Sequence, residues 1–396
     1  MSEKKRKAEA NVYPLFLKKA KPGSEDTSTQ STPKDFHAEA NLAAFQELLD
    51  FSLVNDEAEI ARRFDIIPRM LIHEFRLVVK PENKPEVEFQ IMEAEFYLQV
   101  DTCHEDPFTH GSEEQKISGR WYFHRAPKFS KDSHRSLTSS TEYRSGSRKG
   151  MDLTLGGPPQ KSLPTEGGST SGAAQSAERL LRGGILIRTL RQVSNQKVTS
   201  GPSLLVDRIL EASGVSDIKE LVETKWGGNT AAFFSETSSP ATCLYLKPVP
   251  AVSKPATIYL SPRIGLELSH PGTTGPTILP LHPRIRFLLR RYRFFIHPEK
   301  LVANGRPQTF LGVLHSCISS YPTLAAGLLK PSLSREISRI TGVKEQTSAK
   351  YLTEYVAGRN GGAELLQSFI GAKGKGASSS PATYLQMLGA ISTLEI

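Results

Sequence analysis

The sequence predicts an α+β protein: a single curved antiparallel β-sheet, or open barrel-like core, with peripheral helices and a helical C-terminal extension. Three observations predict this class. Residues 86–98 partly alternate between polar and apolar side chains, and a turn at 81–85 joins them to a predicted strand at 68–80, which indicates a hairpin. Residues 38–63 place apolar side chains at helical spacing. From residue 307 onward the pattern is helical.

Further elements and their grouping follow from the same patterns. Short apolar segments predict strands at 119–124, 150–155, 183–190, 243–247, 257–261 and 292–297. Pro202 is expected in the first turn of a helix that runs to about Ala212. We expect a disordered basic tail at 1–35, a folded domain at 36–305 and the helical extension at 306–396. Segments 125–147 and 156–178, rich in Ser, Gly or Pro, are predicted to be disordered insertions.

Charge and composition favour a polyanionic partner. The 396 residues carry a formal net charge of +9, which favours nucleic acid; the alternative is charge that only maintains solubility. The three cysteines, Cys103, Cys243 and Cys317, form no CxxC pair, so neither a zinc site nor a disulfide framework is indicated. No apolar stretch is long enough to span a membrane, and the charged N-terminus lacks the apolar core of a secretion signal.

Two basic clusters near the N-terminus resemble a bipartite nuclear import signal, which predicts an import receptor as partner and a nuclear location. They consist of Lys4, Lys5, Arg6 and Lys7, then Lys18, Lys19 and Lys21. The alternative is a nonspecific cationic tail. Between the clusters lies an apolar patch, with Tyr13 and Phe16, that is a candidate for a partner-docking peptide.

One predicted strand carries a pattern that suits chemistry. Glu93, Glu95 and Tyr97 alternate along it, so they point to one face of the sheet, which is either solvated or a functional site. Further short motifs follow it along the chain. They are Asp-Pro-Phe-Thr-His at 106–110, Gly-Arg-Trp-Tyr-Phe-His at 119–124, Gly-Met-Asp-Leu-Thr at 150–154, Gly-Gly-Ile-Leu-Ile-Arg-Thr-Leu at 183–190, Gly-Pro-Ser-Leu-Leu-Val at 201–206, Pro-Arg-Ile-Gly-Leu at 262–266 and Arg-Phe-Phe-Ile at 293–296.

In order, spacing and residue type, these motifs resemble the alkyladenine (3-methyladenine) DNA glycosylase family over residues 62–302. The resemblance implies a monofunctional DNA N-glycosylase of base excision repair, which flips a modified base out of the duplex. Glu95 matches the carboxylate that activates water and stabilises an oxocarbenium-like charge, and Arg188 would hold that water or a flanking phosphate. The matched pocket positions are Tyr97, His110, Tyr122, His124 and Asp152. No metal or organic cofactor is implied, and no Schiff-base route.

Two departures from the family pattern concern the pocket. His124 stands where the family usually has a second tyrosine, and Asp152 where it usually has an asparagine. An imidazole is smaller than a phenol and titrates, so base preference is expected to differ. An acid at position 152 would select or reject an amino group on the base, or raise the pKa of Glu95.

The resemblance also predicts where DNA is contacted. Segment 125–147 falls at the tip of the hairpin that enters the minor groove in the family, with Phe129 and Tyr143 as wedge candidates; the alternative is a loop that only attracts phosphates. The run at 283–293 either lines the DNA backbone or is a surface strand with solvated arginines. The candidate contacts are Arg148, Lys149, Arg263, Arg284, Arg286, Arg290 and Arg291.

Alternatives remain for the C-terminal region and for the whole protein. Residues 333–356 have the spacing of a helix–turn–helix, but an ordinary helical pair that caps the fold has the same pattern.

The expected partner is double-stranded DNA, bound by a monomer. The main alternative function is a catalytically altered DNA- or chromatin-binding protein on the same scaffold. A third is a glycosidic hydrolase that acts on another nucleic-acid or nucleoside substrate.

Overall fold

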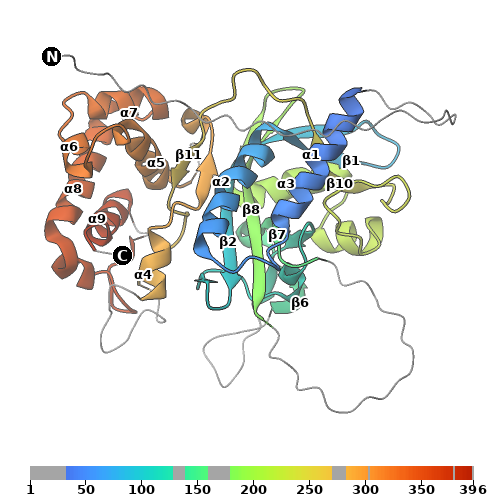
Figure 1. The fold of residues 1–396 in the computed structure, drawn as a ribbon, viewed down its shortest axis with the longest axis horizontal. Coiled ribbons are helices and arrows are strands. Elements are labelled where there is room, and N and C mark those ends of the chain that lie inside the picture. Colours follow the sequence, from blue (N-terminus) through green and yellow to red (C-terminus); the bar gives the residue numbers. More distant parts are fainter. Residues whose placement is uncertain are drawn as a thin grey trace, which may run out of the picture.

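The computed structural model describes residues 33–127, 139–158, 179–269, 282–301, 304–377 and 380–394. The N-terminal basic clusters, the patch around Tyr13 and Phe16, and Phe129 lie outside the described residues. So do 128–138 of the first predicted insertion and 159–178 of the second. The described residues form a mixed α+β structure with a large antiparallel sheet and helices, as the sequence predicts (Figure 1).

The main sheet has the strand order β10-β1-β2-β8-β7-β4, and every pair in it is antiparallel. Strand β12 pairs with β2 and with β11, while β3 pairs with β2 and β9 with β8. The strands are β1 (Phe75–Lys80), β2 (Val87–Val100), β3 (His104–Glu105), β4 (Trp121–Phe123), β7 (Met151–Leu155), β8 (Leu181–Gln192), β9 (Val198–Ser200), β10 (Cys243–Pro248), β11 (Tyr259–Ser261) and β12 (Arg293–Phe295). A separate hairpin joins β5 (Arg125–Pro127) to β6 (Ser139–Tyr143).

The sheet is not a closed barrel. Its two ends, β4 and β10, approach each other through residues 230–232: the Trp121 amide donates to the Thr230 carbonyl at 2.7 Å, and the Leu246 amide donates to the Ala232 carbonyl at 2.8 Å. Within the described residues β4 and β10 do not pair directly. A short segment therefore bridges the two ends of the sheet, and the sheet is not closed by direct pairing of its end strands.

Three helices pack on the apolar face of the sheet: α1 (Pro33–Leu49), α2 (Glu57–His73) and α3 (Pro202–Ser213) (Figure 1). The expectation of one helix over 38–63 is wrong, because the Asp56 side chain caps a new helix by accepting from the Glu59 amide at 2.8 Å. The expected strand at 68–80 is also wrong over its first half. Ile60, Phe64 and Ile67 belong to an apolar stripe that continues at helical spacing past an internal Pro68.

The two faces of the sheet differ in chemistry. Along β2, Ala94, Phe96 and Leu98 belong to the main hydrophobic core. The alternating side chains Glu93 and Glu95 are also buried but lie on the opposite face. The sheet therefore has one apolar face that stabilises the fold and one polar face that carries buried charges.

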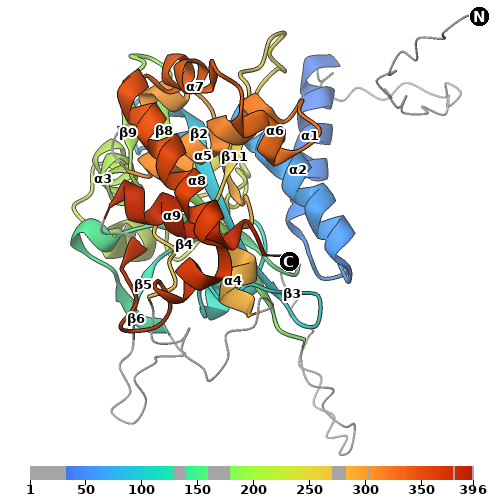
Figure 2. The same cartoon turned by 90° about the vertical axis from the view of Figure 1, so that its left-hand side faces the viewer.

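The C-terminal helices stand beside the sheet at the β11–β12 side and share a second hydrophobic core (Figures 1 and 2). They are α4 (Pro283–Leu288), α5 (Arg306–Ile318), α6 (Leu324–Leu328), α7 (Leu333–Thr341), α8 (Glu345–Gln367) and α9 (Pro381–Ile391). Helix α4 replaces the surface strand considered for 283–293. Gly342, in a left-handed conformation with φ of 70°, ends α7 and allows the turn into α8. In the part of the chain that the structure describes, no helix is both long and apolar enough to cross a bilayer.

Helices α8 and α9 cross at close range because two glycines lie at the contact. A Cβ atom at Gly389 would collide with the Tyr355 carbonyl oxygen, and one at Gly358 with the Gln386 carbonyl oxygen. Only a residue without a side chain allows the two backbones to approach this closely. The crossing holds α9 against α5, which also packs on β11.

We expect Gly389→Ala to lower the free energy of unfolding by about 1–3 kcal/mol, because the added methyl group meets rigid backbone rather than a mobile side chain. Chemical denaturation measures the change. Gly376→Ala is the matched control, since a Cβ there meets nothing within 4 Å. Equal stability of the two variants would contradict the close crossing.

Candidate active site

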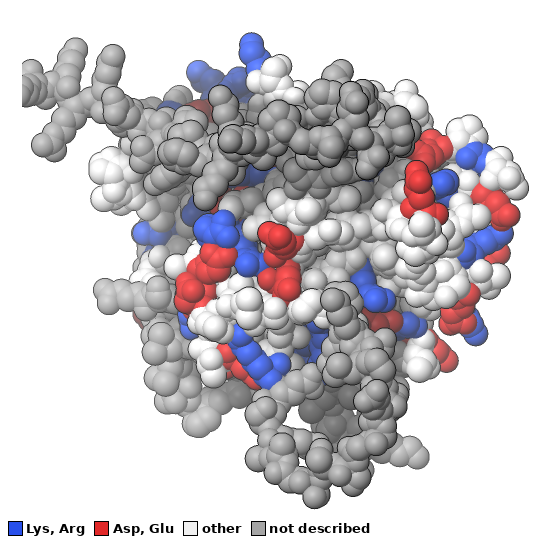
Figure 3. Space-filling model, turned by 45° about the vertical axis from the view of Figure 1, so that its right-hand side comes forward, with Lys and Arg blue, Asp and Glu red and all other residues white. Residues whose placement is uncertain are grey.

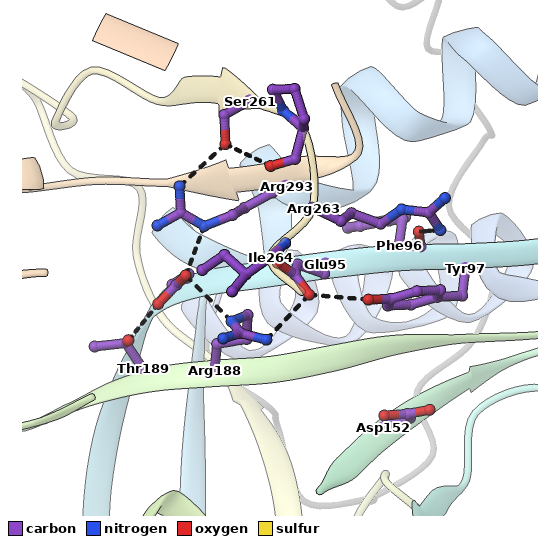
Figure 4. Close-up of polar contacts among 12 residues, drawn as sticks. Glu95, Phe96, Tyr97, Asp152, Arg188, Thr189, Ser261, Arg263, Ile264 and Arg293 are labelled. Atoms are coloured by element: carbon purple, nitrogen blue, oxygen red, sulfur yellow. Dashed lines mark hydrogen bonds and ion pairs between the residues drawn. The ribbon is translucent and has the colours of Figure 1, made fainter. Parts of the chain in front are cut away.

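Glu95, at the centre of β2, is fully buried and hydrogen-bonded on both oxygens (Figure 4). Its Oε1 accepts from the Ile264 backbone amide at 2.7 Å. Its Oε2 accepts from the Tyr97 hydroxyl at 3.0 Å and from the Arg188 guanidinium at 3.1 Å. The structure thus brings together three of the predicted site residues: Glu95 and Arg188 are buried, and Tyr97 is partly buried.

A β-bulge puts Arg188 in this position. In the pairing of β2 with β8, Glu93 faces Thr189 and Ala94 faces Ile187, so Arg188 is an extra residue on β8. Bulges of this kind re-aim a side chain and are common beside active sites. The Arg188 guanidinium lies between the two acids of β2, with its Nε 3.3 Å from Glu93 Oε1.

Glu93 links this group to a second arginine. Its Oε1 accepts from Arg293 Nε at 2.6 Å and its Oε2 accepts from the Thr189 hydroxyl at 2.5 Å. Burial alone would raise the pKa of Glu93, but Arg293, Arg188 and Thr189 together lower it. Burial alone would likewise lower the pKa of Arg188, whereas Glu95 and Glu93 raise it. Glu93 and Arg188 therefore stay ionised. They belong to an alternating series of basic and acidic side chains, Arg293–Glu93–Arg188–Glu95, which we call the ionic chain.

A row of side chains connects the ionic chain to the other predicted pocket residues. Glu95 pairs with Leu186, Leu186 with Asp152, and Asp152 with Tyr122. Paired residues on neighbouring strands point to the same face, so all four lie on the polar face of the sheet. Asp152 lies beyond β8 from Glu95, two strand spacings or ~10 Å away.

The second group on this row is aromatic and acidic. His124 Nε2 lies 2.9 Å from Asp152 Oδ1, and the Gln115 amide donates to Asp152 Oδ2 at 3.1 Å. The ring centroid of His124 is 4.5 Å from that of His110 and 5.8 Å from that of Tyr122. Burial and the neighbouring His124 lower the pKa of His110 to about 4, so its imidazole is neutral at physiological pH. We call Tyr122, His110, His124 and Asp152 the aromatic–acid group.

Several predicted DNA contacts have other roles in the structure. Arg263 is 1 % exposed and its guanidinium is bonded to both oxygens of Asp106, at 2.5 and 3.1 Å, so the prediction that it contacts DNA is wrong. Its guanidinium lies 4.4 Å from the centroid of the Tyr97 ring and so packs against a residue of the site. The Arg125 guanidinium lies 3.7 Å from the centroid of the Tyr143 ring. It therefore covers one face of the ring that was predicted to wedge into DNA.

The remaining predicted cations lie nearer the surface but differ in their partners. Arg286 and Arg290 both pair with Glu57, and Lys149 pairs with Asp207. Arg284 lies over the Phe108 ring, 5.1 Å from its centroid. Arg148 and Arg291 are exposed. On the face shown in Figure 3, cations and acids of the described residues lie mixed.

Sequence reasoning assigned no role to Asp106, Gln115 or Arg293, although each holds a site residue. Arg293 carried a signal, because an arginine beside Phe294 and Phe295 in an apolar strand needs a buried acid. Asp106 and Gln115 lie in a loop and a short 3₁₀ turn, where local patterns do not reveal burial. Among the described residues, no group of His, Cys, Asp or Glu is arranged to hold a metal ion.

The fold and the buried polar face define an α+β protein with a carboxylate-centred candidate active site, and comparison with known proteins adds one relative. No family model matches the chain. Over 181 residues the chain is 30% identical to "Uncharacterized protein L759" of Acanthamoeba polyphaga mimivirus, a match that covers 45% of this chain and 69% of the viral protein. The chain therefore belongs to one family with this viral protein, whose name states no activity.

The lowered pKa of Glu93 leads to a test of the ionic chain. A carboxyl group with a folded-state pKa below its ordinary value of 4.5 contributes stability above that pH and loses it as the pH falls through the folded-state pKa. Glu93→Gln should therefore destabilise the protein by about 3–5 kcal/mol at pH 7, because two buried arginines lose a shared partner. Its stability should also fall less steeply than that of the wild type below pH 4.5.

Denaturation curves between pH 3 and 7 measure both effects. Glu88→Gln is the control on the same strand, since Glu88 pairs with Lys247 nearer the surface. A Glu93→Gln curve parallel to that of the wild type would show that Glu93 is not ionised in the folded state.

Proposed function

We propose that this protein is a monofunctional DNA N-glycosylase that excises an alkylated or otherwise modified base from double-stranded DNA in base excision repair. One observation carries the proposal: the Glu95 carboxylate, held by Arg188, Tyr97 and a backbone amide, shares a row of the polar face with the aromatic–acid group. The separation of ~10 Å suits a nucleoside whose sugar lies at Glu95 and whose base lies at His110 and Tyr122. The resemblance of the sequence motifs supports the same assignment.

The proposed reaction uses Glu95 as general base. A carboxylate has about four lone-pair sites, of which three are filled by Ile264, Tyr97 and Arg188, so one on Oε1 remains to accept from a water. As the water oxygen attacks the sugar C1′, its proton passes to Glu95 and the N-glycosidic bond breaks, with the bonding electrons leaving on the base. A cationic alkylated base leaves as a neutral molecule, so it needs no proton from the protein. The carboxylate also stabilises the positive charge that develops on the sugar.

The aromatic–acid group is the proposed base pocket. The rings of Tyr122, His110 and His124 offer stacking faces, which favour an electron-poor alkylated base. His124 and Gln115 hold Asp152 in place, so its remaining lone pairs are oriented to accept from an amino group of the base. We infer that the pair at positions 124 and 152 sets the choice of base.

A second function is favoured by one specific observation. Glu95 is fully buried in this conformation, and Arg188 is only 7 % exposed, so a nucleotide reaches the acid only after the surrounding side chains move. This closed state favours a catalytically altered DNA- or chromatin-binding protein on the same scaffold. A hydrolase of free nucleosides is the third candidate. Nuclear location, an import receptor and a monomeric state complete the proposal for the glycosylase.

Base release by wild type and Glu95→Gln distinguishes these functions. We expect the wild type to form abasic sites in at least one of a set of duplexes with different modified bases, and Glu95→Gln to be slower by ~10²–10⁴-fold, because it lacks the general base. Abasic sites are scored by alkaline cleavage, with duplex binding and Tm as controls for folding. Equal binding without base release by either protein would overturn the glycosylase, and release from nucleosides alone would favour the third candidate.

The salt dependence of binding tests the contact with DNA. If exposed arginines neutralise phosphates, log Kd should change linearly with log salt, and Arg148→Ala should reduce the slope by ~0.9. Titrations of a labelled duplex between 50 and 200 mM salt measure the slope. Arg69→Ala, on the outer surface of α2 beside Asp65, is the matched control and should leave it unchanged. A flat salt response would contradict phosphate contact altogether.

A further inference from the structure

Two polar side chains of the C-terminal helices are buried without a hydrogen-bond partner for one of their atoms. Gln308 on α5 is 4 % exposed and Tyr384 on α9 is 3 % exposed. Within the described residues, neither Gln308 Oε1 nor the Tyr384 hydroxyl has a partner in hydrogen-bond geometry, although the two side chains lie close enough to interact with each other. Buried polar atoms are nearly always paired, and leaving them unpaired is destabilising, so an unpaired acceptor beside an unpaired donor points to a small polar ligand.

Gln308 lies on the side of α5 that faces the candidate active site. The first turn of α5 lies against Ile264, whose backbone amide donates to Glu95: a Cβ atom at Gly305 would collide with the Ile264 side chain and lie 3.6 Å from Gln308 Oε1. The next residue, Thr309, accepts a hydrogen bond from Arg293 at 3.0 Å. Gln308 therefore approaches Glu95 from the helical side of the site.

Tyr384 approaches the same place from α9. Its phenol lies beside Gln308 and within electrostatic reach of Glu95, Arg293 and Arg263. Burial and the nearby Glu95 carboxylate raise its pKa, so the hydroxyl stays protonated and remains a donor. The two helices pack on each other, which places a donor and an acceptor from residues 76 positions apart at one point.

We propose that Gln308 and Tyr384 form a hydroxyl-binding subsite, supplied by the C-terminal helices, that holds a water molecule beside Glu95. The hydrogen bonds balance: the water accepts from the Tyr384 hydroxyl and donates to Gln308 Oε1 and to the remaining lone pair of Glu95 Oε1. The catalytic part of the inference rests on the proposed glycosylase function, in which this water is the nucleophile. Gln308 and Tyr384 are then positioning residues, and the C-terminal helices complete the active site.

The binding part is tested without any activity. If the Tyr384 hydroxyl holds a water, Tyr384→Phe lowers Tm by about 2 °C, because a buried hydrogen bond is lost. If the hydroxyl has no partner, its removal raises Tm or leaves it unchanged, which overturns the subsite. Tyr355→Phe, a buried tyrosine on α8, is the matched control for loss of a phenol.

A double-mutant cycle with Gln308→Met, which keeps the side-chain length, tests the shared ligand. We expect the two losses to be non-additive, because either change releases the same water, and a high-resolution crystal structure to show that water within hydrogen-bond distance of Gln308, Tyr384 and Glu95. Additive losses, or density without a water there, overturn the subsite.

The catalytic part is tested on the best duplex from the base screen. Tyr384→Phe should lower the single-turnover rate of base release about 10- to 100-fold while Kd for the duplex is unchanged, and Tyr355→Phe should match the wild type. An unchanged rate in Tyr384→Phe overturns the catalytic role. If the wild type releases no base from any duplex, the glycosylase proposal fails, whereas the stability cycle still decides whether the subsite exists.

Discussion

The ionic chain of Arg293, Glu93, Arg188 and Glu95 is the interaction on which the arrangement of the polar face depends. Each member is buried, and a buried charge without a partner would be strongly destabilising. Because positive and negative groups alternate, each charge is compensated by its neighbours. The chain joins β12, β2 and β8, and Arg293 extends it to α5 through Thr309. Three strands and a helix therefore have to be correctly placed before each of these charges has its partner.

Such a network is weak evidence that its charges stabilise the fold, since well-packed apolar residues in the same positions often give equal or higher stability. The opposite face of the same strand shows that apolar packing is available to this fold, with Phe96 and Leu98 in the main core. Buried, coupled acids and bases are instead concentrated at functional sites. The contrast between the two faces of β2 is the physical reason to locate chemistry at Glu95.

How much could be predicted depended on whether a contact is local. The alternation of Glu93, Glu95 and Tyr97 predicted a shared face, and the structure agrees, since alternation along a strand is a local property. The end of α1 was missed because the cap at Asp56 interrupts a helical pattern that otherwise looks continuous. Arg188 reaches Glu95 because of a bulge in the pairing of β8 with β2. The two residues are 93 positions apart in the sequence, so no local pattern reveals their contact. The burial of Arg263 likewise depends on Asp106, 157 residues earlier, so its charge was taken for a surface charge.

The same reasoning explains why the C-terminal helices were left without a role by their sequence. Nothing in the pattern around Gln308 or Tyr384 distinguishes them from other polar residues on amphipathic helices, and only the packing of α5 on β11 and α9 brings the two side chains together. Arg293 bonds both Glu93 on β2 and Thr309 on α5. The position of α5 and the geometry of the buried acids are therefore coupled through a single guanidinium group, so the C-terminal helices and the polar face of the sheet form one structural unit.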